Sequence, residues 1–151
     1  MTILAGKRVL LCVGGGIAAY KSAELVREFI TAGATVQVAM TKAATEFISP
    51  LTLQTLSRQR VATDLLSASE DADIGHIRIS DEADVVIVAP ATAGLISRMA
   101  SGMADDVVTA ALLATTAPVV VAPAMNTNML DHPAVRDNLD RLAAFGHRIV
   151  E

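Results

Sequence analysis

The feature that most constrains the fold is a run of apolar residues that stops abruptly at three glycines. Residues Lys7–Val13 read KRVLLCV, and Gly14–Gly16 follow directly. A strand without polar alternation must be covered on both faces, as in a parallel sheet between two layers of helices. The same kind of run recurs along the chain, at Thr35–Met40, Asp84–Ala89, Pro118–Ala122 and His147–Val150, with a shorter candidate at Arg60–Thr63.

Helical patterns separate these runs. The first extends to Ala32 and is stopped by Gly33. The others are a short stretch through Phe47, one after Pro50, a long one over Ala91–Ala114 broken near Gly102, and one from Pro133 to Gly146 capped by Asp131 or His132. Strands that alternate with helices predict an α/β fold with a doubly wound parallel sheet, Rossmann-like, and a single domain over residues 1–151.

Composition excludes several classes of function. Apolar residues make up 52% of the chain, yet no apolar run reaches the roughly 18 residues of a membrane span. The net charge of -4, with Lys and Arg scattered, argues against nucleic acid as a partner. One cysteine, Cys12, rules out a disulfide framework and a multi-cysteine metal centre, so no metal is expected. The first residues show no signal-peptide pattern, which favours a cytoplasmic protein.

Small and hydrogen-bonding residues follow the predicted strands. In open α/β sheets ligands bind beyond the carboxyl ends of the strands. The glycine turn before a helix suits a phosphate, and Gly14, Gly16 and Ala19 fit the G-x-G-x-x-A spacing of dinucleotide folds. The second strand, however, ends at Thr41 and not at the acidic residue that holds a ribose in those folds. This favours a mononucleotide such as FMN over NAD.

Five motifs together resemble one family. They are GGGIAAYK from Gly14, Met40-Thr41 with Phe47 downstream, GHIRIS around His76, PATAG from Pro90 and PAMNTNM from Pro123. In order and spacing they resemble the FMN-dependent cysteine decarboxylase flavoproteins, above all the bacterial enzymes that act on 4'-phosphopantothenoylcysteine in coenzyme A synthesis. The resemblance covers nearly the whole chain. The histidine of GHI and the PxMNxxM motif are its specific parts.

The resemblance implies a role for each matching residue. His76 would be the catalytic histidine, and Asn126 would hold the substrate carboxylate with Met129 beside it. The cofactor-binding residues would be Gly15, Gly16, Ile17, Thr41, Phe47, Thr92, Ala93 and Ala124. The implied reaction is decarboxylation to 4'-phosphopantetheine, and the implied assembly is a homotrimer or a multiple of trimers. A non-catalytic FMN-binding regulatory subunit, a flavin prenyltransferase and a peptidyl-cysteine decarboxylase remain alternatives.

Several residues also have simpler interpretations. Asn126 can cap the following helix, and Cys12 is expected in the core. Lys21, Lys42 and Arg98 are expected at the surface, where one of them could reach a substrate phosphate. Gly14 stands where relatives often have serine. The sequence given ends at Glu151, before the flap with its cysteine that the resemblance implies; without that flap we expect FMN binding and at most about one CO2 released per flavin.

Overall fold

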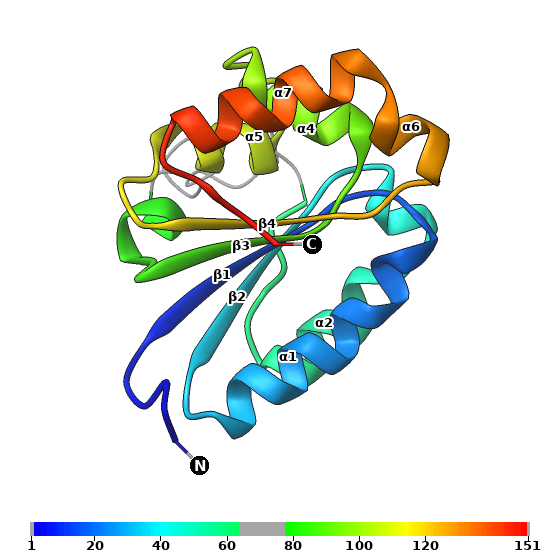
Figure 1. The fold of residues 1–151 in the computed structure, drawn as a ribbon. Coiled ribbons are helices and arrows are strands. Elements are labelled where there is room, and N and C mark those ends of the chain that lie inside the picture. Colours follow the sequence, from blue (N-terminus) through cyan, green and yellow to red (C-terminus); the bar gives the residue numbers. More distant parts are fainter. Residues whose placement is uncertain (1, 64–77, 151) are drawn as a thin grey trace.

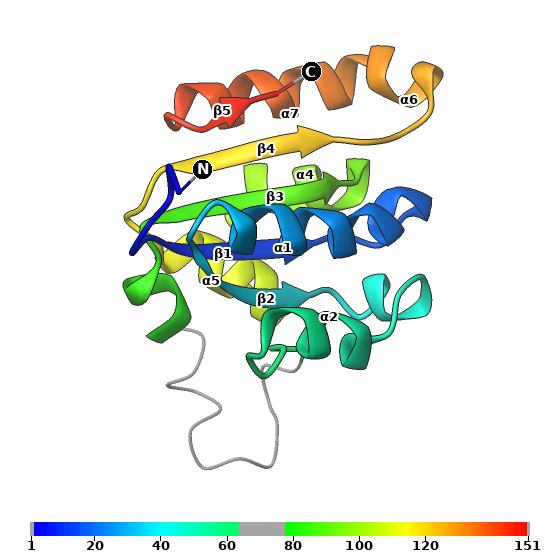
Figure 2. The ribbon, with the colours of Figure 1, turned by 90° about the horizontal axis from the view of Figure 1, so that it is seen from below.

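The computed structural model describes residues 2–63 and 78–150, and in these ranges five parallel strands form one sheet. The strands are β1 (Arg8–Val13), β2 (Thr35–Met40), β3 (Val85–Ala91), β4 (Val119–Pro123) and β5 (Arg148–Ile149) (Figure 1). Their order across the sheet is β2-β1-β3-β4-β5, which Figure 2 shows from β5 to β2. The chain therefore winds outward in both directions from the junction of β1 and β3. The predicted doubly wound parallel α/β sheet is confirmed.

Helices cover both faces of the sheet (Figure 1). One face carries α1 (Ser22–Thr31) and α2 (Pro50–Ser57), each preceded by a short 3-10 turn, η1 (Ile17–Lys21) and η2 (Ala44–Glu46). The other face carries α4 (Ala93–Ala100), α5 (Val107–Ala114) and α7 (Pro133–Ala144), with the short α6 (Thr127–Asp131) before α7. None of the helices in the described ranges is long and apolar enough to span a bilayer.

The apolar run of β1 is explained by burial on both sides. Leu10 and Cys12 pack into the core with α4, α5 and α7, while Leu11 and Val13 pack into the core with α1 and α2. All four side chains are fully buried, because successive residues of a strand point to opposite faces. Burial, with a smaller effect from Asp106, raises the pKa of the Cys12 thiol to about 12. Cys12 is therefore a core residue, as predicted, and an unreactive one.

One predicted strand is wrong. The Arg60–Thr63 segment forms only a single bridge, in which Ala62 N donates to Val38 O and Met40 N donates to Ala62 O, both at 2.9 Å. Next to this bridge, the side chain of Gln37 takes the place of a backbone partner from β2. Its Nε2 donates to Arg60 O at 2.8 Å.

The helical region after β3 follows the prediction in outline, ends at Ala114 as predicted, and differs from the prediction where it begins. The break near Gly102, which has a φ of 72°, is confirmed. The strand runs on through Pro90 to Ala91, and the helix starts only at Ala93 with Thr92 as its N-cap. At the last helix the cap is His132, whose Nδ1 accepts from Ala134 N at 3.0 Å.

Candidate functional site

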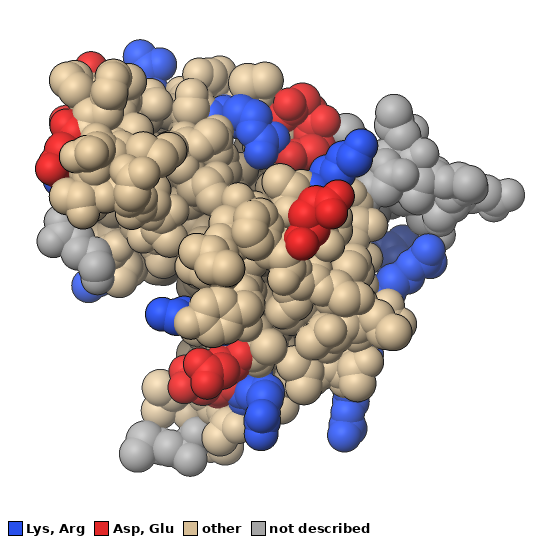
Figure 3. Space-filling model, turned by 90° about the vertical axis from the view of Figure 1, so that its right-hand side faces the viewer, with Lys and Arg blue, Asp and Glu red and all other residues tan. Residues whose placement is uncertain are grey.

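The carboxyl ends of four parallel strands meet at one edge of the sheet, which we call the carboxyl edge. It carries Gly14–Gly16 after β1, Thr41 after β2, Thr92 and Ala93 after β3, and Ala124 and Asn126 after β4. Figure 3 looks onto this side of the molecule, whose surface is largely uncharged with Lys, Arg, Asp and Glu side chains scattered over it. Chain winding reverses between β1 and β3, and such a switch point is where ligands bind in open α/β sheets.

Gly14 joins β1 to β3 at this switch point. Its N–H donates to Pro90 O at 3.0 Å. A Cβ on Gly14 would lie 2.5 Å from that oxygen and 3.2 Å from Leu95 Cδ2. A serine at this position would need the end of β3 to move, so the glycine allows the close approach of the two strands.

Gly15 joins the β1 turn to the β2 turn. A Cβ on Gly15 would overlap the Cβ of Ala43 and would lie 2.9 Å from Ala44 N. Thr41 holds the second turn in place, because its N–H donates to Val13 O and its Oγ1 accepts from Ala44 N, each at 3.1 Å. The Thr41 side chain is only 3% exposed. Thr41 therefore shapes the turn through its backbone N–H and its side-chain oxygen.

The start of η1 offers unused hydrogen-bond donors. The backbone of Gly16 is extended, and a Cβ there would meet only Thr92 Cγ2, at 3.4 Å. Ala19 N donates back to Gly16 O, but no acceptor in the described part of the chain pairs with the N–H groups of Gly16 and Ile17. Unpaired N–H groups at a glycine turn bind anions, phosphate above all.

Two polar side chains at the carboxyl edge cap helices and can still form further hydrogen bonds. Thr92 Oγ1 accepts from Leu95 N at 3.2 Å, and Asn126 Oδ1 accepts from Met129 N at 2.9 Å. The helix-cap interpretation of Asn126 is thus correct. The cap uses only the amide oxygen, however, and Asn126 is exposed, so its Nδ2 group is available to donate to a ligand. Ala124 N donates to Ala91 O at 3.0 Å, which ties the β3 and β4 ends together.

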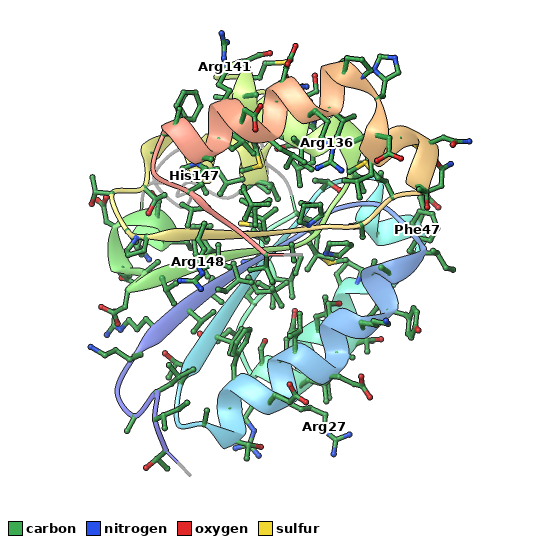
Figure 4. All side chains as sticks on the ribbon, in the orientation of Figure 1. Arg27, Phe47, Arg136, Arg141, His147 and Arg148 are labelled. Carbon is green, nitrogen blue, oxygen red and sulfur yellow. The ribbon has the colours of Figure 1, made fainter. Side chains whose placement is uncertain are left out.

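Large apolar side chains stand exposed around the edge. The exposed fraction is 79% for Ile17, 48% for Phe47 and 44% for Met129. Figure 4 shows Phe47 at the end of the molecule where α6 lies. Covering these three side chains, which we call the rim, would remove apolar surface from water, so the rim is suited to cover by a ligand or another protein surface.

The structure brings the predicted residues of four strand ends to one edge, with one exception. His76 lies outside the described residues. Sequence reasoning missed Ala43, whose closeness to Gly15 leaves no signal in the sequence. Two hollows lie away from the edge: one of about 340 Å³ at the amino ends of β1 and β2, and one of about 250 Å³ between α4, α5 and the end of α7. They contain none of the predicted site residues.

Comparison with known proteins identifies close relatives. Residues 2–151 match the family described as Flavoprotein. The chain is 52% identical over 147 residues to the coenzyme A biosynthesis bifunctional protein CoaBC of Vibrio cholerae, and 50% identical over 149 residues to CoaBC of Bacillus subtilis. These alignments cover 97% and 99% of the chain. The chain spans only 37% of the length of either relative.

Solved structures give the same answer. The FMN-dependent cysteine decarboxylase TvaF from thioviridamide biosynthesis matches with a TM-score of 0.91 at 34% identity, over 97% of this chain and 91% of that one. A PPC decarboxylase variant complexed with pantothenoylaminoethenethiol matches with a TM-score of 0.79 at 31% identity, over 95% of this chain and 81% of that one. The chain belongs to the flavoprotein family that includes the FMN-dependent cysteine decarboxylases.

Proposed function

We propose that this chain binds FMN at the carboxyl edge and catalyses decarboxylation of 4'-phosphopantothenoylcysteine to 4'-phosphopantetheine. The observation that carries the proposal is the pair of unpaired N–H groups, on Gly16 and Ile17, at the switch point between β1 and β3. A phosphate there could approach these donors closely, because Gly15 and Gly16 have no side chains to block it. The sequence identity to the CoaBC relatives, 52% and 50%, supports the choice of substrate.

The remaining edge residues fit a flavin mononucleotide in this orientation. Thr41 secures the turn beside the phosphate, with Phe47 beyond it. Thr92, Ala93 and Ala124 present small side chains from the β3 and β4 ends, which leaves room for a flat ring and its ribityl chain. FMN held there would supply reversible two-electron chemistry: it would accept two electrons from the substrate carbon that bears sulfur, so that the electrons released with CO2 can pass to sulfur, and it would return two electrons to the decarboxylated product.

The chain's own side chains orient the substrate and move protons. The Asn126 Nδ2 group donates to the substrate carboxylate, with the exposed Met129 beside it. A neutral amide holds the carboxylate without the strong pairing of an arginine, which would stabilise the ground state and oppose loss of CO2. His76 transfers the proton at the thiol, a task that suits an imidazole near neutral pH.

We further propose a homotrimer, or a multiple of it, located in the cytoplasm. The exposed rim of Ile17, Phe47 and Met129 supports a second subunit at the edge. The coenzyme A biosynthetic role of the relatives supports the location. A monomer in sedimentation at micromolar concentration would contradict the assembly.

A second substrate class is favoured by one observation. The structural match to TvaF is closer than the match to PPC decarboxylase, at TM-scores of 0.91 and 0.79. A peptide with a carboxyl-terminal cysteine is therefore the alternative substrate.

One experiment separates these outcomes. The cofactor of the purified chain is released by denaturation and identified by mass, and CO2 release is followed with phosphopantothenoylcysteine and with a cysteine-terminated peptide. We expect the released cofactor to be FMN. We expect CO2 release with phosphopantothenoylcysteine and none with the peptide. CO2 from the peptide alone would favour the alternative. FMN without CO2 from either would indicate the regulatory function, and a dinucleotide would overturn the proposal.

A further inference from the structure

Arg98 forms a half-buried network that the proposed function does not use. Its Nη1 donates to Asp106 Oδ2 at 2.7 Å and to Asp105 Oδ1 at 3.2 Å. The Arg98 and Asp106 side chains are 28% and 24% exposed. Arg98 therefore lies near the surface as expected, but its side chain is only partly exposed and is paired with two carboxylates. The connection from α4 to α5 folds back and places both carboxylates against it.

Asp106 links this ion pair to the start of α5. Its Oδ1 accepts from Thr109 N at 2.7 Å and from Thr109 Oγ1 at 2.8 Å, which makes Asp106 the cap of α5. Burial disfavours the charged form of Asp106, but the hydrogen bonds from Arg98 and Thr109 outweigh it and hold the pKa below its usual value. The last turn of α4 is thus tied to the first turn of α5 by a charged, directional contact.

The opposite end of α4 touches the glycine turn. Thr92, the cap of α4, has its Cγ2 3.4 Å from the Cβ position of Gly16, and Leu95 Cδ2 is 3.2 Å from that of Gly14. Arg98 lies only six residues after Thr92, roughly 9 Å along a helix axis. Because α4 is only eight residues long, we expect a shift at Arg98 to be passed on to Thr92 and Leu95.

The ion pair adds to the apolar packing of α4. Leu95, Ile96, Met99 and Ala100 form the buried face of the helix, and the ion pair of Arg98 with Asp106 gives its last turn a directional contact. We propose that Arg98, through Asp106, is a positioning residue that sets the first turn of α4 against the glycine turn and thereby shapes the flavin site. The part of this inference that concerns the flavin rests on the proposed function.

The test separates Arg98 from the α5 cap. Asp106→Asn keeps an oxygen for Thr109 but turns an NH2 group toward Arg98, so it breaks the ion pair and retains the cap. Arg98→Met removes the positive charge. Arg98→Lys keeps a charge on a single ammonium group, so it is expected to retain part of the contact with Asp106 that Arg98→Met loses. Arg8→Met is the matched control, because it removes an exposed ion pair, Arg8 Nη1 to Glu82 Oε2 at 3.5 Å, at the amino end of the sheet.

Two measurements are made well below the melting temperature, where every variant is folded. In the cofactor-free chain, hydrogen exchange at Leu95 and Ile96 should be faster in Asp106→Asn and Arg98→Met than in the wild type and in Arg8→Met. With FMN added, affinity should fall roughly tenfold in these two variants, with a changed flavin circular dichroism spectrum. Arg98→Lys should lie between them and the wild type.

The outcomes that overturn the proposal are distinct from failure of the proposed function. Unchanged exchange at Leu95 and Ile96 in both variants removes the positioning role, whether or not FMN binds. A lower melting temperature with unchanged FMN affinity and spectrum shows that the network only stabilises the fold. A wild-type chain that does not bind FMN defeats the proposed function and the flavin part of the inference together, and the exchange result still decides the role of Arg98 in placing α4.

Discussion

Gly15 and Ala43 are packed so closely that there is no room for a side chain at position 15. The Cβ position of Gly15 overlaps the Cβ of Ala43, and Ala43 C lies 2.7 Å from that position. Gly15 follows β1 and Ala43 follows β2, so the contact joins the ends of two neighbouring strands. The glycine is required here by close approach rather than by an unusual backbone angle.

Gly15→Ala is expected to separate the two turns. Overpacking of this kind typically costs about 1–3 kcal/mol in the free energy of unfolding, and the distorted turn should also lose FMN affinity. Chemical denaturation and FMN titration measure both effects. Gly94→Ala is the matched control: a Cβ at this α4 position meets nothing within 4 Å, so stability should stay the same or rise. Equal behaviour of the two variants would show that the contact does not matter.

Thr41 provides a second test of the same turn. Thr41→Val keeps the shape but leaves Ala44 N without its acceptor in a buried place, which typically costs about 1–3 kcal/mol. Thr41→Ser keeps the hydroxyl and should retain most of the stability and of the FMN affinity. Denaturation midpoints of the two variants decide the point. If Val is tolerated as well as Ser, the hydroxyl is not what holds the turn.

Much of this architecture could be predicted from the sequence, because it rests on local patterns. The apolar run of Lys7–Val13 requires burial on both faces, and glycine and proline mark the ends of elements. The single bridge at Ala62 could not be predicted, since the side chain of Gln37 replaces a strand partner there. The contact of Gly15 with Ala43 depends on how two separate turns pack, and the ion pair of Arg98 with Asp106 depends on how the connection from α4 to α5 folds back. The residue pattern of the sequence indicates neither.

His147 makes stability depend on pH. Burial lowers its pKa below the usual value of 6.5, and its ring lies edge-on to Phe145 with centroids 6.0 Å apart. The unfolded chain therefore binds a proton more readily, and the contribution of His147 to stability is lost as pH falls from about 6.5. His147→Leu should lose less melting temperature between pH 7 and pH 5 than the wild type. Phe145→Leu, which removes the ring contact and keeps the imidazole, should retain the wild-type dependence; parallel curves for all three would contradict the assignment.

His76 tests the chemistry apart from the cofactor. His76→Asn should bind FMN nearly as well as the wild type, because the proposed imidazole role is proton transfer. CO2 release should fall by on the order of 10² to 10⁴, the usual loss for a general acid–base group. Flavin titration and CO2 measurement on one preparation give both values. Near-normal CO2 release would remove His76 from the mechanism.

The helix cap formed by Asn126 and its proposed substrate contact use two different atoms, so they can be tested separately. Its Oδ1 caps α6 by accepting from Met129 N, while the proposed substrate contact uses Nδ2. Asn126→Asp keeps a cap oxygen but removes the donor and places a negative charge against the substrate carboxylate. The variant should keep its melting temperature and FMN affinity, and should lose substrate binding and CO2 release.

Asn126→Ala completes this test. It removes both atoms, so it should also lose roughly 1 kcal/mol of stability as the α6 cap is lost. Calorimetric titration with phosphopantothenoylcysteine, beside thermal denaturation of each variant, distinguishes the two functions. Substrate binding by Asn126→Asp at the wild-type level would show that the amide donor does not hold the carboxylate. Asn126 would then act only as a helix cap, because aspartate retains the cap oxygen but lacks the Nδ2 donor.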